Sequence, residues 1–215
     1  MQSFWYREFN IESQLPEGWQ KAIIDLAMHD AKQKTLIASS VTSRELKSDV
    51  RIEVLTVGGG TIRRRLPWLF DLYRGLFKDI AQTLTTEPLS TAMDVRYAIN
   101  LNVQRGDKMR YECHVDSNPI EGLLYATNQP AGSGGDLVVA SDTRARGIEA
   151  ISQSAVRIYP CVGKLVFFDA RIHPHFIAPL ADPHGLRVVV AMNYYLPSCP
   201  ESSRPADLNR HLGIE

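Results

Sequence analysis

The sequence predicts a mainly β protein with flanking helices, whose core is a double-stranded β-helix of the jelly-roll, cupin-like kind. Three observations lead to this fold class. About eight short segments carry the apolar pattern of strands, turns rather than helices separate most of them, and two helical segments precede the majority. Many short strands at even spacing are typical of an antiparallel sandwich or barrel.

A length of 215 residues suits one domain. We expect a single domain over residues 1–215, with an N-terminal helical support layer at about 1–90, a β-helix core at about 91–197 and a polar tail at 198–215. The tail is rich in Ser and Pro and is expected to hold one short helix near 206–212.

The first part of the chain is expected to contain a helix and then a strand. Residues 1–14 are predicted to be irregular. Pro16 suits the first turn of a helix, and apolar residues at helical spacing extend this helix to about Lys34. Residues 49–57 alternate between apolar and polar side chains, which predicts a half-buried strand. The glycines at 58–60 are interpreted as a flexible turn, because the lysine spacing of a phosphate-binding loop is absent.

A second helix is predicted to begin at Pro67. Apolar residues from Leu69 to Leu84 form one stripe that should pack against the outside of the sheet; partner binding is a less common use of such a stripe. The basic run at 63–65 is expected to lie in a solvated loop or at a helix start.

Strands follow in quick succession from residue 94 onward. The first has an unusual polar face, shared by Arg96, Asn100, Asn102 and Gln104. Because successive side chains of a strand point to opposite faces, these residues lie either in water or along a polar pocket inside the barrel. The strands are predicted near 94–104, 110–116, 122–128, 136–140, 155–159, 164–168 and 186–196.

Composition argues against nucleic acid and membranes as partners. Lys and Arg together number 24, as do Asp and Glu, so no net charge attracts a polyanion. No apolar run is long enough to cross a bilayer, and the N-terminus lacks the apolar core of a signal peptide. The three cysteines show neither zinc-site spacing nor a disulfide framework. We therefore expect a cytoplasmic protein, and the sequence leaves a homodimer open.

Candidate metal ligands lie in two segments far apart in the sequence. His114-x-Asp116 would place an imidazole and a carboxylate on the same face of a strand. His175 follows an apolar strand and could add the third ligand, with His173 and His184 as competitors. Two imidazoles and one carboxylate on one side of a metal form the facial triad of non-haem Fe(II) oxygenases. Histidines that lie in surface loops are the alternative.

These ligands belong to an ordered set of motifs from about Met93 to Leu196. The set comprises Tyr111-x-x-His114-x-Asp116, Leu124-Tyr125-Ala126-Thr127-Asn128, Gly134-Gly135-Asp136-Leu137, Ile158-Tyr159-Pro160, Gly163-Lys164-Leu165-Val166-Phe167-Phe168, His175-Phe176-Ile177-Ala178-Pro179 and Arg187. In these motifs the chain resembles the Fe(II)- and 2-oxoglutarate-dependent oxygenase superfamily, and it is closest to the prolyl-4-hydroxylase-like branch. His-x-Asp alone is a weak signal, but the ordered set is specific.

The resemblance implies roles for the residues at the core of these motifs. His114, Asp116 and His175 would be the catalytic iron ligands, and His175 is preferred because His175-x-x-x-Pro179 fits the family pattern. Arg187 would grip the distal carboxylate of 2-oxoglutarate, since a guanidinium can pair with a carboxylate through two hydrogen bonds. A surface ion pair is the alternative for this arginine.

Further contacts are predicted around the cosubstrate and the substrate. Gln104, Asn102 and Tyr125 would add hydrogen bonds to 2-oxoglutarate, although the family often has Tyr at the place of Gln104. Tyr111 and Asn193 are the candidates for substrate contact, with plain packing as the alternative for Tyr111.

The resemblance also implies Fe(II) as cofactor, 2-oxoglutarate and O2 as cosubstrates, and ascorbate as a supporting reductant. Asp116 argues for hydroxylation, desaturation or ring formation over halogenation, because halogenases of the superfamily have a small residue there. We expect hydroxylation of an unactivated C–H bond in a small molecule, such as an amino acid or a biosynthetic intermediate. The alternatives are a protein or peptide side chain as substrate, and a non-catalytic cupin-like metal-binding or sensing domain.

Overall fold

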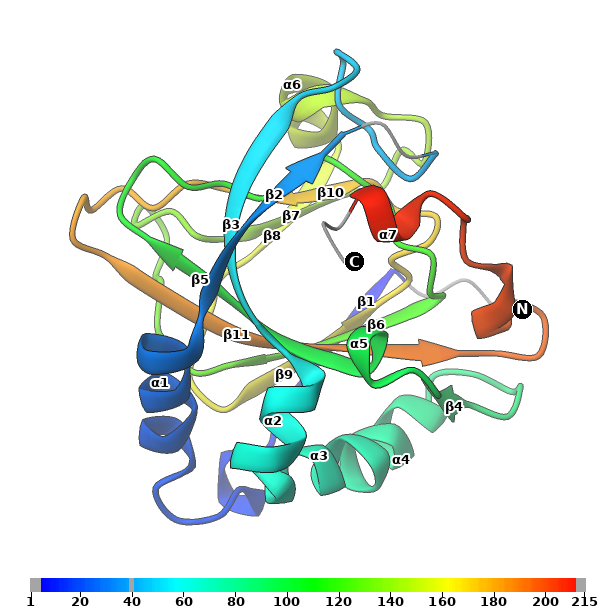
Figure 1. Ribbon diagram of the computed structural model, residues 1–215. Helices are drawn as coiled ribbons and strands as arrows, with labels where there is room; N and C mark the ends of the chain where they lie inside the picture. The colour runs from blue at the N-terminus through cyan, green and yellow to red at the C-terminus, as the bar shows by residue number, and fades with distance from the viewer. Residues whose placement is uncertain (1–4, 39–40, 212–215) are drawn as a thin grey trace.

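The computed structural model describes residues 5–38 and 41–211, and Figure 1 shows their arrangement. The parts of the predicted N-terminal segment, C-terminal helix and tail that fall on residues 1–4 and 212–215 lie outside this description. Two antiparallel sheets face each other, and helices cover the far side of the larger sheet. The prediction of a mainly β protein with a jelly-roll core and flanking helices is therefore confirmed.

The large sheet runs in the order β1-β9-β6-β11-β5-β3-β2, and a short β4 pairs with the end of β11. Its centre is β11 (Leu186–Tyr195), which lies between β5 (Ile99–Arg105) and β6 (Ile120–Tyr125). The remaining strands are β1 (Tyr6–Asn10), β2 (Lys32–Ile37), β3 (Arg51–Gly58), β4 (Ser90–Thr91) and β9 (Lys164–Phe168).

The small sheet lies across from the large one and holds three strands among the described residues. Leu123 and Tyr125 of the large sheet share one buried cluster with side chains of the small sheet, which joins the two layers. In order across the small sheet, the strands are β10 (His175–Ile177), β7 (Leu137–Ala140) and β8 (Ala155–Ile158).

Helices pack on the outer face of the large sheet, below it in Figure 1. Leu69, Tyr73 and Phe77 are fully buried and share a core cluster with Leu101 of β5 and Val190 of β11. Burial of one such side chain contributes about 1.5–3 kcal/mol, so this layer carries much of the stability. The helices are α1 (Trp19–Asp30), α2 (Gly59–Arg65), α3 (Pro67–Arg74) and α4 (Leu76–Gln82).

Short helices complete the architecture. The predicted C-terminal helix is confirmed for Leu208–His211 as α7, and two 3-10 turns, η1 and η2, lie at Glu12–Gln14 and Glu201–Ser203. Helices α5 (Val95–Ala98) and α6 (Gly147–Gln153) were not predicted. Within the described residues, no helix combines the length and apolar character needed to span a bilayer.

Six of the predicted strands are confirmed, with ends shifted by three residues or fewer. These are the predicted strands 49–57, 122–128, 136–140, 155–159, 164–168 and 186–196, which correspond to β3, β6, β7, β8, β9 and β11.

Two predictions near the N-terminus are wrong. Residues 1–14 are not all irregular, because Tyr6–Asn10 forms β1 by pairing with β9, a contact between segments far apart in sequence. The first helix ends at Asp30 rather than Lys34, and Lys32–Ile37 forms the edge strand β2. Its lysines are typical of an edge strand, where charge discourages pairing with another chain.

The glycines at 58–60 are not a turn, because α2 begins at Gly59. A Cβ on Gly59 would collide with the backbone carbonyl oxygen of Val95, so glycine allows α2 to approach the start of α5. The basic run occupies the last turn of α2 rather than a loop or a helix start. Positive charge is favourable there because it complements the helix dipole.

Two further predicted segments are each divided into two elements in the structure. The helix predicted from Pro67 to Leu84 is divided at Gly75 into α3 and α4. The strand predicted at 94–104 begins with one helical turn, α5, because the Asp94 side chain accepts a hydrogen bond from the Arg96 N–H (3.0 Å) and caps it. Only from Ile99 onward is this segment extended.

Candidate active site

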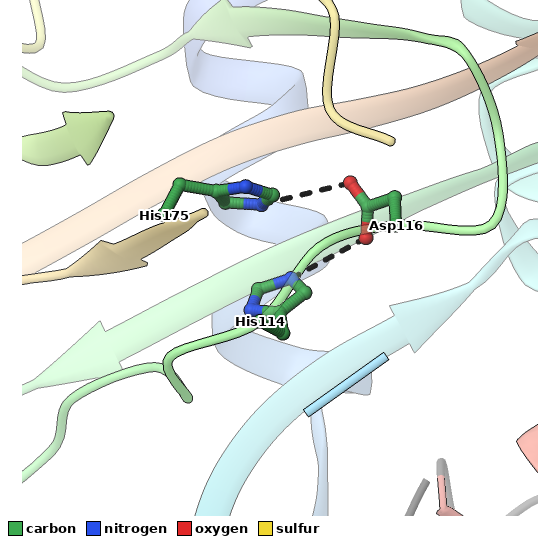
Figure 2. A group of neighbouring side chains, drawn as sticks. All are labelled: His114, Asp116 and His175. Atoms are coloured by element: carbon green, nitrogen blue, oxygen red, sulfur yellow. Dashed lines mark ion pairs between the residues drawn. The ribbon is translucent and has the colours of Figure 1, made fainter. Parts of the chain in front are cut away.

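His114, Asp116 and His175 point toward one another between the two sheets (Figure 2). The Nε2 atom of His114 is 3.3 Å from Asp116 Oδ1, and the Nε2 atom of His175 is 3.6 Å from Asp116 Oδ2. One ligand atom of each residue lies within 4.8 Å of the others, so a single metal ion could bind all three.

The His114-x-Asp116 segment is irregular, so the strand predicted at 110–116 is wrong. An isolated backbone pairing positions it instead. The His114 N–H donates to the His175 carbonyl (3.0 Å), and the His175 N–H donates to the His114 carbonyl (2.9 Å). The Asp116 N–H donates to the carbonyl of Ala170 (2.8 Å) in the β9–β10 connection. The ligands therefore meet through main-chain hydrogen bonds between neighbouring segments and not through one strand face.

The connection between β2 and β3 supports this segment from the other side. Glu45 Oε1 accepts hydrogen bonds from Arg110 Nη1 (2.7 Å) and from the Cys113 N–H (2.9 Å). Backbone bonds from Arg44 N–H to the Cys113 carbonyl and from Val115 N–H to the Thr42 carbonyl continue the contact. A segment that lacks its own regular structure is thereby held on both sides.

Backbone carbonyls orient both imidazoles. His114 Nδ1 lies 2.7 Å from the Glu112 carbonyl, and His175 Nδ1 lies 2.9 Å from the His173 carbonyl. A carbonyl only accepts, so each Nδ1 carries the proton that it donates. In the neutral ring Nε2 then presents a lone pair toward the centre, as in most histidine–metal sites.

The competing histidines lie elsewhere. His173 Nδ1 is 2.9 Å from the Ala140 carbonyl, and its ring packs 6.2 Å from the ring of Trp5. His184 lies in an exposed turn that the Asp182 carboxylate stabilises by accepting its N–H. Neither belongs to the cluster with Asp116.

The two imidazoles that share Asp116 have opposite pKa shifts. Burial alone lowers the pKa of His114, but its hydrogen bond to Asp116 and the charge of that carboxylate outweigh burial and raise the pKa to about 9. Burial, followed by repulsion from His114, lowers the pKa of His175 to about 4. A metal ion binds only neutral imidazoles, so metal binding at this cluster would compete with protonation of His114.

A cavity of about 120 Å³ extends from the three ligands between the sheets. Besides Tyr111 and the three ligands, its polar lining comes from residues of three adjacent strands of the large sheet, β5, β11 and β6. The lining residues are Asn100, Asn102, Tyr111, His114, Asp116, Glu121, Leu123, Leu137, Phe168, His175, Ile177, Arg187, Val189, Ala191 and Asn193.

Arg187 lies at one end of this cavity and is only 1% exposed. Its Nε and Nη2 atoms make no hydrogen bond within the described residues, and burial lowers the pKa of the guanidinium. Tyr125 lies beside it, with its ring centroid 5.6 Å from Arg187 Cζ, and its buried hydroxyl also lacks a partner in the described chain. Buried donors without acceptors are costly, so this end of the cavity fits a carboxylate ligand.

The remaining predicted cosubstrate contacts differ from each other. Asn102 lines the cavity, and its Oδ1 accepts from Asn100 Nδ2 (2.6 Å), which leaves its own amide N–H groups for a ligand. The Gln104 amide instead donates to the carbonyls of Met109 and Ala178, both at 3.1 Å. An interaction of Gln104 with a carboxylate stays a prediction, and its N–H groups already have acceptors.

Both predicted substrate contacts line the cavity near the ligands. The Tyr111 ring lies 5.5 Å from the His114 ring, and burial followed by the charge of Asp116 raises the pKa of Tyr111. Asn193 Nδ2 donates to the Tyr97 carbonyl (2.6 Å). Both residues also line a second pocket of about 80 Å³ that shares His114 and Asp116 with the first.

Sequence reasoning missed Glu121, which lines the cavity on β6. Its Oε2 accepts from Asn118 Nδ2 (3.1 Å), and burial, followed by the charge of Asp116, raises its pKa well above the usual value. The available signal was its position two residues before Leu123 and four before Tyr125, on the face that points inward.

Comparison of the structure with solved structures shows which fold this is. A prolyl hydroxylase from Trichoplax adhaerens, solved with a hypoxia-inducible-factor peptide, is similar with a TM-score of 0.64 at 14% identity, over 93% of this chain and 87% of that one. A 2OG-Fe(II) oxygenase from Burkholderia pseudomallei has a TM-score of 0.57 at 11% identity, over 88% and 84% of the two chains.

HygX from Streptomyces hygroscopicus, solved with nickel and 2-oxoglutarate, has a TM-score of 0.57 at 10% identity, over 89% of this chain and 83% of that one. No protein-family model matches the sequence, and no curated protein matches it. The chain thus has the fold of the 2-oxoglutarate- and Fe(II)-dependent oxygenases, prolyl hydroxylases included, at a sequence identity that establishes the fold alone.

Proposed function

We propose that this protein is an Fe(II)- and 2-oxoglutarate-dependent oxygenase that hydroxylates an unactivated C–H bond of a small molecule. One observation carries the proposal. The cavity that holds the clustered ligand atoms of His114, Asp116 and His175 ends at Arg187, a buried guanidinium with unbonded N–H groups. A metal ligand set and a carboxylate site in one cavity are what a chelating keto acid requires.

The donor set fits ferrous iron. Two imidazole nitrogens and one carboxylate oxygen are the ligands of the facial triad, and they leave coordination positions for other molecules. Cys113 lies next to His114 in the sequence but does not belong to the cluster of ligand atoms, and burial raises the pKa of its thiol to about 12. The site therefore offers no sulfur donor that would favour zinc or copper.

The chain's own residues would divide the work along the cavity. His114, Asp116 and His175 would hold the metal on one side, while Arg187, Tyr125 and Asn102 would bind the distal carboxylate of 2-oxoglutarate. Bound iron would supply the oxidation chemistry: O2 would convert 2-oxoglutarate to succinate and CO2, and its second oxygen atom would go to the substrate.

Apolar side chains surround the polar groups of the cavity. Leu123, Phe168, Val189 and Ala191 line it and are nearly fully buried. They would exclude water from the reacting atoms, which keeps the reaction on the bound substrate. The carboxylate of Asp116 occupies the position that a halide would need, which favours hydroxylation, desaturation or ring formation over halogenation.

The size of the cavity supports a small molecule, such as an amino acid or a biosynthetic intermediate. A volume of about 120 Å³ is modest, and the cavity is lined by residues of both sheets. The hypoxia-inducible-factor peptide in the Trichoplax adhaerens structure is a ligand of that prolyl hydroxylase, and nothing follows from it for the substrate of this chain. Hydroxylation of a peptide side chain is the alternative, and the experiment below would reveal it if a peptide rather than a small molecule gained the oxygen atom.

The test is formation of succinate by purified protein supplied with Fe(II), ascorbate and 2-oxoglutarate. Slow, metal-dependent succinate formation without substrate is expected, and a true substrate should accelerate it and gain one oxygen atom by mass spectrometry. Failure of 2-oxoglutarate to bind the Fe(II)-loaded protein would instead favour a non-catalytic metal-binding domain.

A further inference from the structure

The end of the cavity opposite Arg187 carries a different chemistry. Arg187 and Asn193 share the inward face of β11 six positions apart, which corresponds to about 20 Å along a strand. Asn193 is the cross-strand partner of Glu121 on β6, so these two side chains form one patch beside the metal ligands. The cavity thus has a cationic end and an end that carries a carboxyl group.

The second end presents hydrogen-bond acceptors. Asn193 uses its amide N–H on the Tyr97 carbonyl (2.6 Å), which leaves its carbonyl oxygen for the cavity. Glu121 receives one hydrogen bond, from Asn118 Nδ2 to Oε2 (3.1 Å), and no Lys or Arg of the described residues forms an ion pair with it. Glu121 is 7% exposed. A carboxyl group that has one hydrogen bond and no ion pair is costly to bury.

We propose that the substrate carries an amino group, and that Glu121 and Asn193 bind it beside the metal ligands. This inference rests on the oxygenase function proposed above. An ammonium group donates up to three hydrogen bonds and would stabilise the ionised form of Glu121 as an ion pair, so it satisfies both acceptors at once.

Other substrate groups fit this patch less well. A hydroxyl group donates only one hydrogen bond and brings no charge. The tertiary amide of a prolyl residue has no N–H to donate, so the patch disfavours a peptidyl-proline at this position. A primary or secondary amine held at Glu121, across the cavity from Arg187, would place its neighbouring carbons over the metal ligands.

The test measures amine binding without turnover. The full-length protein is loaded with Ni(II) and 2-oxoglutarate, and the twenty common amino acids and short diamines are titrated calorimetrically beside their N-acetylated counterparts. We expect at least one amine to bind, its acetylated counterpart to bind about ten-fold more weakly or worse, and Glu121→Gln to weaken the same amine by a similar factor. Affinity for 2-oxoglutarate should not change in this variant.

Glu149→Gln is the matched control, because it removes a carboxylate from the exposed face of α6 and should leave amine binding unchanged. Equal binding of free and acetylated amines, wild-type affinity in Glu121→Gln, or no binding by any amine would overturn the proposal. The two proposals fail separately. Amine binding without 2-oxoglutarate binding would refute the oxygenase and leave the amine site, whereas the reverse result would refute only the amine site.

Discussion

The two faces of β5 and β11 are built from alternate residues of the same strands, yet only one of them is complete without a ligand. On the outer face, Leu101 and Val190 are fully buried among helix side chains. On the inner face, Arg187 is equally buried but keeps N–H groups without acceptors, and Asn102 lines the cavity. Neighbouring residues of one strand should therefore separate stability from binding.

The largest effect is expected on the inner side of the sandwich, at Asp116. Asp116→Ala removes the only carboxylate of the triad, so metal-dependent succinate formation should fall by about 1,000-fold or more, equivalent to about 4 kcal/mol. Enzymatic succinate assay measures it, with circular dichroism to show that the fold is kept. Asp142→Ala removes an exposed carboxylate and serves as the control. Succinate formation at the wild-type rate would contradict the assigned site.

Leu101→Ala tests the outer face of the same sheet. Leu101 is fully buried in the core shared with the helices, so truncation should lower the free energy of unfolding by about 3 kcal/mol through lost burial and a cavity. Denaturant unfolding measures this loss. Affinity for 2-oxoglutarate should stay within about two-fold of wild type, and a larger change would show that the faces are coupled.

Arg187→Met should lower the affinity for 2-oxoglutarate and raise the free energy of unfolding, so its two effects have opposite signs. Affinity for 2-oxoglutarate is expected to fall about 100-fold, or about 2.7 kcal/mol, since the carboxylate loses its charged partner. The free energy of unfolding of the ligand-free protein should rise, since an uncompensated buried cation is replaced by an apolar side chain. Calorimetry and denaturant unfolding measure the two quantities, and a large loss of stability would refute the assignment of Arg187 as an unsatisfied ligand-binding group.

The smallest effect is expected at Glu45, which belongs to neither face. Burial alone would raise the pKa of Glu45, but its hydrogen bonds and the charge of Arg110 outweigh burial and hold the pKa below 4.5. A carboxyl group with a depressed pKa stabilises the folded state above its unfolded pKa, and this contribution disappears as pH falls through the folded pKa.

Glu45→Gln should therefore lower the free energy of unfolding by about 2 kcal/mol at pH 7. The difference from wild type should shrink below pH 4.5. Urea unfolding as a function of pH measures it. A difference that is constant from pH 3 to pH 7 would exclude the charge of Glu45 as its cause.

Local patterns predicted the strands of the central part of the large sheet. The apolar run of β9 and the alternation in β5 and β11 are properties of the segments themselves, and the alternation placed Asn100 and Asn102 on the face that lines the cavity. Of the two interpretations of that polar face, a pocket inside the barrel is the one observed for these two residues.

Several of the errors occur where partners far away in the chain decide the structure. Tyr6–Asn10 is a strand because β9 is beside it, and no local period indicates this. The segment around His114 is positioned by Glu45 and by His175, so its ligands converge without a strand. Glu121 was not predicted as a site residue, because a single acidic residue in an apolar strand can be placed in a cavity only once the neighbouring strands are known.

The main chains of the two histidines in the cluster are joined by a reciprocal pair of hydrogen bonds, which fixes the spacing of the two backbones at this point. A metal ion bound as proposed above would therefore meet two imidazoles whose backbones the fold itself holds side by side, rather than having to draw distant segments together.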